Sequence, residues 1–174
     1  IPAARMAAGR LAEAPLPLRL CYLQSATKTL TDAASLLCEE TQCGVELMGE
    51  ASPEADAEVI ALAVKACEDA GLRDFQLELG QAQFVAGFLQ EAGLDEEQSA
   101  VLRGMIERKN ALDMQLYLDK LAISADVAQR LMRLPRLYGD ASILDEAAAL
   151  PRHPLCVAAI DNLREVLAML AEYG

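Results

Sequence analysis

The chain has 174 residues, a length that allows one domain or one domain with an appendage. Its formal net charge of −12 disfavours a phosphate-binding face, because affinity for nucleic acid depends on lysine and arginine. Hydrophobic residues make up 53% of the chain, but no apolar stretch approaches the roughly 20 residues that a membrane span requires. We therefore expect a cytoplasmic protein that binds neither nucleic acid nor membrane.

The five cysteines form no CxxC pair, and His153 is the chain's single histidine. A zinc site or a catalytic dyad normally needs several such groups together. We expect reduced cysteines that pack as small apolar residues, an exposed His153, and no metal, cofactor or catalytic residue.

The first half of the chain predicts a helix followed by two strands. Residues 1–11 have helical spacing without a preceding cap, and the chain begins with isoleucine, so we expect an internal fragment of a longer protein. Leu18–Leu23 and Gly44–Met48 are compact apolar runs of strand length. The polar segment Gln24–Glu40 between them predicts a long mobile loop.

A second helix is predicted to start at Ser52, which is a good N-cap and is followed by Pro53, and to end at Gly71. Its expected inward residues are Val59, Ile60, Ala63, Val64 and Cys67. Phe75–Leu79 alternates between apolar and polar residues and predicts a third strand. An apolar helix is expected after Gly80.

The remainder of the sequence predicts helices only. They are expected at about 95–109, 111–121, 124–134, 141–149 and 155–173. We divide the chain into a core over residues 1–93, a helical insertion over 94–152, and a helix over 153–174 that returns to the core.

Gln42 and Glu46 lie four residues apart on a predicted strand. Period two places both on one face, with Gly44 between them. A carboxylate and an amide beside a gap without a side chain would suit a small polar ligand. The alternative is a pair of polar residues that simply face solvent on an edge strand.

The segment Cys21–Gly49, with its Q-x-G-x-E pattern at Gln42–Glu46, resembles motif 2 of the class II aminoacyl-tRNA synthetases in their histidyl branch. Ser52–Phe84, Leu134–Asp140 and Leu163–Gly174 are similar to the regulatory subunits of ATP phosphoribosyltransferase, a related family. The resemblance implies an α+β fold, in which a class II aminoacyl-tRNA synthetase-like antiparallel sheet fragment has flanking helices and a helical insertion. It also implies that Gln42 and Glu46 bind histidine.

One departure from the synthetase pattern bears on activity. Where the synthetases have Phe-Arg-x-Glu, whose arginine holds the ATP α-phosphate, this chain has Thr27, Lys28, Thr29 and Leu30. Lysine lacks the planar fork of arginine, and leucine accepts no hydrogen bond. The resemblance therefore implies a protein that no longer charges tRNA.

The function implied is that of a non-catalytic regulatory subunit in the first step of L-histidine biosynthesis. Such a subunit activates a short-form ATP phosphoribosyltransferase catalytic subunit and conveys feedback by L-histidine. When intact it would form a homodimer within a hetero-oligomer. The alternatives are a fragment of a divergent histidyl-tRNA synthetase, which performs ATP-dependent aminoacylation, and a stand-alone protein-interaction module built on the helical half.

Overall fold

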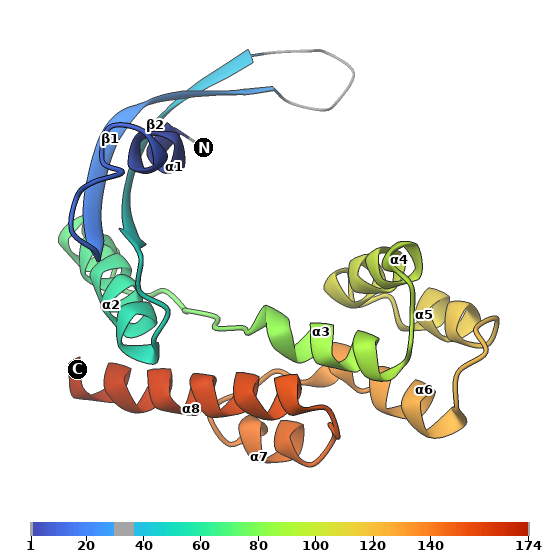
Figure 1. The fold of residues 1–174 in the computed structure, drawn as a ribbon. Helices are drawn as coiled ribbons and strands as arrows, with labels where there is room; N and C mark the ends of the chain where they lie inside the picture. The colour runs from blue at the N-terminus through green and yellow to red at the C-terminus, as the bar shows by residue number, and fades with distance from the viewer. Residues whose placement is uncertain (1, 30–36, 174) are drawn as a thin grey trace. The chain divides into compact units, whose positions relative to one another are not determined.

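The computed structural model describes residues 2–29 and 37–173 (Figure 1). The chain separates into two compact units, residues 1–73 and 74–174, and each is described by itself. None of the helices in the described ranges is long and apolar enough to cross a membrane.

The first unit is built on a two-stranded antiparallel ribbon. Its register runs from Leu18 opposite Met48 to Thr29 opposite Leu37. The elements of the unit, in order, are α1 (Pro2–Ala8), β1 (Leu18–Thr29), β2 (Leu37–Met48) and α2 (Pro53–Asp69). The first helix is therefore shorter than predicted from residues 1–11.

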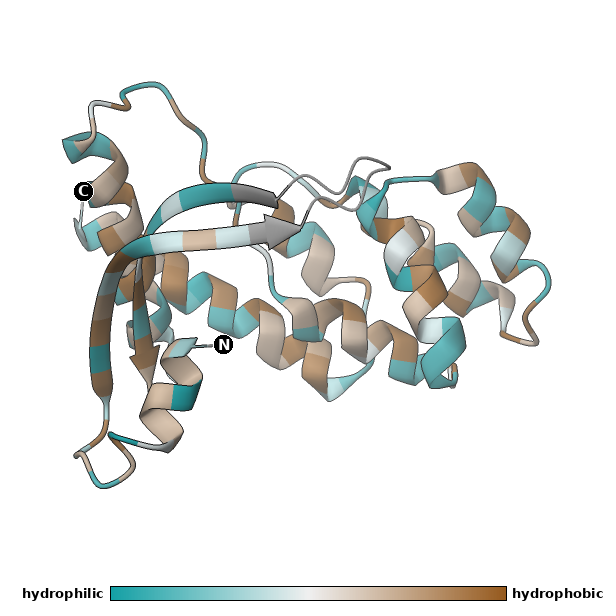
Figure 2. Cartoon of the chain, turned by 90° about the horizontal axis from the view of Figure 1, so that it is seen from above, coloured by the Kyte–Doolittle hydropathy of each residue, from teal (hydrophilic) through white to brown (hydrophobic). Residues whose placement is uncertain are grey.

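Each strand has 12 residues, at least twice the length of its apolar run, so the predicted loop over Gln24–Glu40 is wrong for most of its length. Figure 2 shows the hydrophobic part of the ribbon giving way to more polar residues towards the hairpin end. Polar side chains do not prevent two strands from pairing, because the hydrogen bonds between strands are made by the backbone. Only residues 30–36 of the predicted loop lie outside the described part.

Helix α2 begins as predicted. The Ser52 hydroxyl accepts a hydrogen bond from the Ala55 N–H at 3.4 Å, and Pro53 occupies the first helical position. Ala55 and Ala57 are its buried residues. Of the expected inward residues, Ala63 is exposed and the other four are half-buried, so this helix is less deeply packed than its sequence predicts.

The second unit is entirely helical apart from its connecting segments. Its elements are α3 (Ala82–Glu91), α4 (Glu96–Glu107), α5 (Ala111–Leu118), α6 (Ala125–Leu131), the 3-10 helix η1 (Leu134–Arg136), α7 (Ile143–Ala148) and α8 (Pro154–Tyr173). Its largest fully buried side chains are Phe88, Leu102, Met114, Leu131 and Cys156. These residues come from five different helices, so one shared core holds the unit together.

Helices α3 and α8 approach each other closely at Gly87. A Cβ atom added there would lie 2.4 Å from the Cys156 Sγ atom, which leaves space for glycine alone. The Cys156 thiol donates a hydrogen bond to the Phe84 carbonyl at 3.2 Å, and burial raises its pKa to about 11. This cysteine is a packing residue, as expected from the sequence.

A buried arginine joins three segments of the second unit. Arg130 on α6 donates to Glu91 on α3 at 2.5 Å, to Asp126 at 3.0 and 3.2 Å, and to the Leu150 carbonyl at 3.2 Å. Its guanidinium also lies over the Phe88 ring, 5.9 Å from the centroid. The hydrogen bond from Arg130 holds the pKa of the Glu91 carboxyl below its usual range.

Two local predictions for this unit were wrong. Phe75–Leu79 is not a strand: the structure's one sheet, over the described residues, consists of β1 and β2. Its alternation is typical of a strand, but a strand needs a hydrogen-bonded neighbour, and within the described ranges this segment has none. His153 is half-buried rather than exposed, and its Nδ1 accepts a hydrogen bond from the Leu155 N–H at 3.3 Å at the start of α8.

Candidate functional site

The candidate site is one face of the β1–β2 ribbon, which we call the Gln42–Glu46 face. Residues at alternate positions of β2 lie on this face, and the register places a residue of β1 opposite each. The three cross-strand pairs are Gln42 with Gln24, Gly44 with Tyr22, and Glu46 with Leu20. Gln42 and Glu46 share a face because side chains at alternate positions of a strand point to the same side.

Exposure distinguishes the two faces of β2. Gln42, Gly44 and Glu46 are half-buried, whereas the intervening Cys43 and Val45 are exposed. Within the described residues, neither the Gln42 amide nor the Glu46 carboxylate has a hydrogen bond or an ion pair. Their polar atoms are therefore available to a ligand that lies against this face.

The space above Gly44 is occupied, contrary to the expectation of a gap between Gln42 and Glu46. A Cβ atom added at Gly44 would lie 2.5 Å from both Cζ and Oη of Tyr22. The tyrosine ring therefore crosses the strand at the glycine. Tyr22 was not predicted as a site residue, because the cross-strand register that brings it to Gly44 depends on the length of the hairpin.

The face thus combines an amide, an aromatic ring and a carboxylate in that order along the ribbon. A carboxylate accepts hydrogen bonds from ammonium or imidazole N–H groups, and an amide both donates and accepts. An aromatic ring offers a flat apolar surface that also attracts cations. This combination suits a small, planar, nitrogen-containing ligand.

Two other kinds of site, for ATP and for a metal ion, were considered on the described residues. Leu30, at one of the positions that departs from the ATP-binding pattern, lies outside the described residues. In the described part of the chain, no group of three or more histidine, cysteine, aspartate or glutamate residues is placed to hold a metal ion. Glu58, one of the acidic residues in α2, instead accepts two hydrogen bonds from Arg19 at 2.6 and 2.8 Å.

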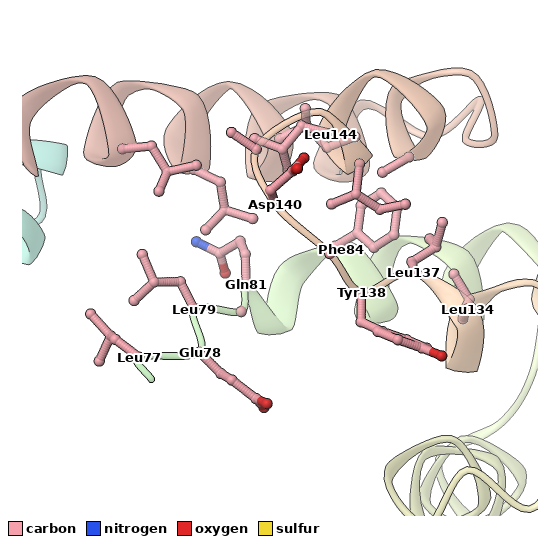
Figure 3. A pocket seen from close by; sticks show the side chains of 18 of the residues that line it. Leu77, Glu78, Leu79, Gln81, Phe84, Leu134, Leu137, Tyr138, Asp140 and Leu144 are labelled. Atoms are coloured by element: carbon pink, nitrogen blue, oxygen red, sulfur yellow. The ribbon is translucent and has the colours of Figure 1, made fainter. Parts of the chain in front are cut away.

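The second unit contains a cavity of about 690 Å³ (Figure 3). It lies between the segment 76–81, the loop before α7, and helices α3, α4, η1, α7 and α8, and leucine is the most frequent residue in its walls. The polar groups at its edge are engaged locally: Lys109 lies 4.7 Å from the Tyr138 ring centroid, and Asp140 accepts from the Ser142 N–H and hydroxyl. The lining also includes Gln76 and Glu78, but most of the residues around the cavity are apolar.

Comparison with known proteins identifies the class. Residues 1–174 match the family model described as Histidyl-tRNA synthetase, and the chain belongs to this family. The histidyl-tRNA synthetase from Nostoc sp. PCC 7120 has a similar fold, with a TM-score of 0.77 over 99% of this chain and 41% of that one, at 19% sequence identity.

Within the family, two curated relatives carry a more specific name. The ATP phosphoribosyltransferase regulatory subunit of Acetivibrio thermocellus is 37% identical over all of this chain and 42% of its own length. The subunit of the same name from Syntrophotalea carbinolica is 36% identical over 98% of this chain and 40% of its own length. The chain thus spans less than half the length of these relatives.

A solved structure supports the same assignment. The ATP phosphoribosyltransferase regulatory subunit/histidyl-tRNA synthetase from Bacillus halodurans C superimposes with a TM-score of 0.89 and 30% identity, over 99% of this chain and 45% of that one. The predicted resemblance to the regulatory subunits and the predicted class II synthetase-like fold are both confirmed.

Proposed function

We propose that the full-length protein is the regulatory subunit of ATP phosphoribosyltransferase in the first step of L-histidine biosynthesis. It activates a short catalytic subunit and conveys feedback by histidine, and it has no catalytic activity of its own. The observation that carries this proposal is the match of the whole chain, at up to 37% identity, to relatives with this name.

The sequence of the ribbon supports the non-catalytic part of the proposal. By resemblance, Lys28 and Leu30 occupy the positions at which synthetases have the arginine and glutamate that contact ATP. Stabilising a phosphoryl or acyl transition state requires charges fixed in place. Neither residue reproduces the hydrogen bonds of the group that it replaces.

We assign the histidine effector to the Gln42–Glu46 face. The two residues match the family's Q-x-G-x-E pattern, lie on the less exposed face of β2, and have unused polar atoms among the described residues. The Glu46 carboxylate accepts a charge-assisted hydrogen bond from the ligand, and Gln42 binds a second polar group of it.

The proposal extends to features that need the complete protein. We assign residues 1–93 and 153–174 to a synthetase-like core and residues 94–152 to a helical insertion. The full-length protein forms a homodimer within a hetero-oligomer and acts in the cytoplasm.

The test uses full-length protein and a short-form catalytic subunit. Added regulatory protein should increase phosphoribosyl transfer to ATP, and histidine should inhibit the activated complex. Glu46→Gln should retain activation but bind histidine about 10- to 100-fold more weakly, since a hydrogen bond to a charged group contributes about 1.5–3 kcal/mol. Absence of activation by the wild-type protein would reject the function, and unchanged histidine affinity in Glu46→Gln would reject the assigned site.

The rival function is histidine activation by a divergent histidyl-tRNA synthetase, which the family model and the fold also accommodate. Histidine-dependent exchange of pyrophosphate into ATP separates the two. We expect background exchange in the full-length protein, and robust exchange would establish the rival.

A further inference from the structure

The feature that carries a further inference is the Tyr22 ring above Gly44. The ring's Cζ and Oη atoms, together with Cε1, are the atoms closest to the position of a Cβ at Gly44, at 2.5 to 2.8 Å. The ring therefore lies across the backbone of β2 and does not extend straight from β1 into solvent. Any side chain at position 44 would displace it.

The ring occupies the middle of the Gln42–Glu46 face. Gly44 is two residues from Gln42 and two from Glu46, and all three lie on the same side of the strand. A ligand that reaches both polar side chains must pass over position 44. At that position it meets the phenol ring of Tyr22, because the glycine has no side chain of its own.

The ring also retains surface for a ligand. Tyr22 is 36% exposed even though one side of its ring covers the strand. Its phenol makes no hydrogen bond within the described residues. An aromatic ring in this position offers its outer face to a planar group, and both stacking and the attraction of a cation to the ring are worth a measurable part of binding.

We propose that Tyr22 is a specificity-determining residue of this site, and that its ring is the surface on which the planar, nitrogen-containing side chain of the effector stacks. The inference rests on the proposed histidine site and adds a role that Gln42 and Glu46 cannot supply. Their groups recognise hydrogen-bonding atoms, which many amino acids possess, whereas a ring selects ligands with a flat side chain.

The experiment compares Tyr22→Phe and Tyr22→Leu in the full-length protein, with Tyr138→Leu as a control at an exposed tyrosine of the other unit. Phenylalanine keeps the ring and loses the hydroxyl, while leucine covers the glycine without an aromatic face. Calorimetric titration with L-histidine should give an affinity within about twofold of wild type for Tyr22→Phe and for the control. For Tyr22→Leu we expect a loss of about threefold to tenfold.

A second measurement separates ligand contact from a structural role. The ring current of an aromatic side chain shifts the NMR signals of protons stacked on it to higher field. Bound histidine should show this shift at its imidazole protons with wild type and Tyr22→Phe, and lose it with Tyr22→Leu. A destabilised ribbon would lower affinity without selectively removing the shift.

The outcomes distinguish this inference from the function on which it rests. If Tyr22→Leu binds histidine like wild type while Glu46→Gln binds weakly, the histidine site stands and the role of Tyr22 is rejected. If Tyr22→Phe loses as much affinity as Tyr22→Leu, the hydroxyl carries recognition and stacking is rejected. If wild-type protein activates the catalytic subunit but does not bind histidine, both the effector site and this inference fail.

Discussion

Replacing Arg130 by alanine should destabilise the second unit more than the loss of any exposed ion pair. The Arg130 and Glu91 side chains are only 11% and 17% exposed, whereas Asp126 is 54% exposed. Removing one partner of a buried pair costs about 3–5 kcal/mol, because the other charge remains buried without compensation. The partial exposure of Asp126 lowers that range, and we expect a loss of about 2–4 kcal/mol.

Hydrogen exchange measured by mass spectrometry is the appropriate assay, because a chain with two units need not unfold in one transition. Amide protection in peptides that contain α6 and α3 should fall by about 1.5 to 3 decades at neutral pH. Arg133→Ala is the matched control. Arg133 pairs with Glu146 at about half exposure on both sides, so its loss should cost less than about 1 kcal/mol.

The pH dependence of this effect has a definite sign. The pKa of Glu91 is lowered in the fold by its hydrogen bond from Arg130, so the stabilisation is present above the pKa of an unfolded glutamate, about 4.3. This stabilisation is lost as the pH falls through the pKa that Glu91 has in the folded protein. The difference between wild type and Arg130→Ala should therefore shrink in acid. Equal protection in the two proteins at neutral pH would refute the argument that the buried charge needs its partner.

Two further predictions concern the contact between α3 and α8. Gly87→Ala should lower stability by about 1–3 kcal/mol through overpacking, and the double variant with Cys156→Ala should recover part of this loss. Gly80→Ala is the control, because a Cβ atom there would meet no atom within 4 Å, and it should be close to neutral in the same hydrogen-exchange assay. Maleimide at neutral pH should modify the exposed Cys21 and Cys43 but leave Cys156 unmodified until urea is added, as read by peptide mass spectrometry. Rapid labelling of Cys156 in the native protein would contradict its buried position.

The helical half was predictable because its signals are local. The helix predicted over 95–109 is α4 (Glu96–Glu107), and Asp95 and Gln98 form the capping box that marks its start. At the starts of α5 and α6, the Asn110 and Ser124 side chains each accept a hydrogen bond from a backbone N–H three residues further on. Such caps satisfy backbone N–H groups at a known distance along the chain, so they can be read without knowledge of the tertiary structure.

The strands were harder to predict because a ladder depends on a distant partner. Gln24–Thr29 is polar, yet it pairs in register with β2, whereas Phe75–Leu79 alternates and has no partner in the described ranges. Side-chain pattern reports which face of a strand is buried, but it does not report whether a neighbour exists. The error at both segments has this one cause.

The site also has one feature that is set within a single strand and one that depends on a distant partner strand. Gln42 and Glu46 lie on one strand, so their shared face follows from the geometry of that strand alone. Tyr22 is 22 positions from Gly44, and only the register of the ribbon brings its ring over the glycine. An empty gap between Gln42 and Glu46 would admit any small polar group. A gap covered by an aromatic ring favours a ligand with a flat group. The part of the site that the sequence did not reveal is therefore the part to which we assign its selectivity.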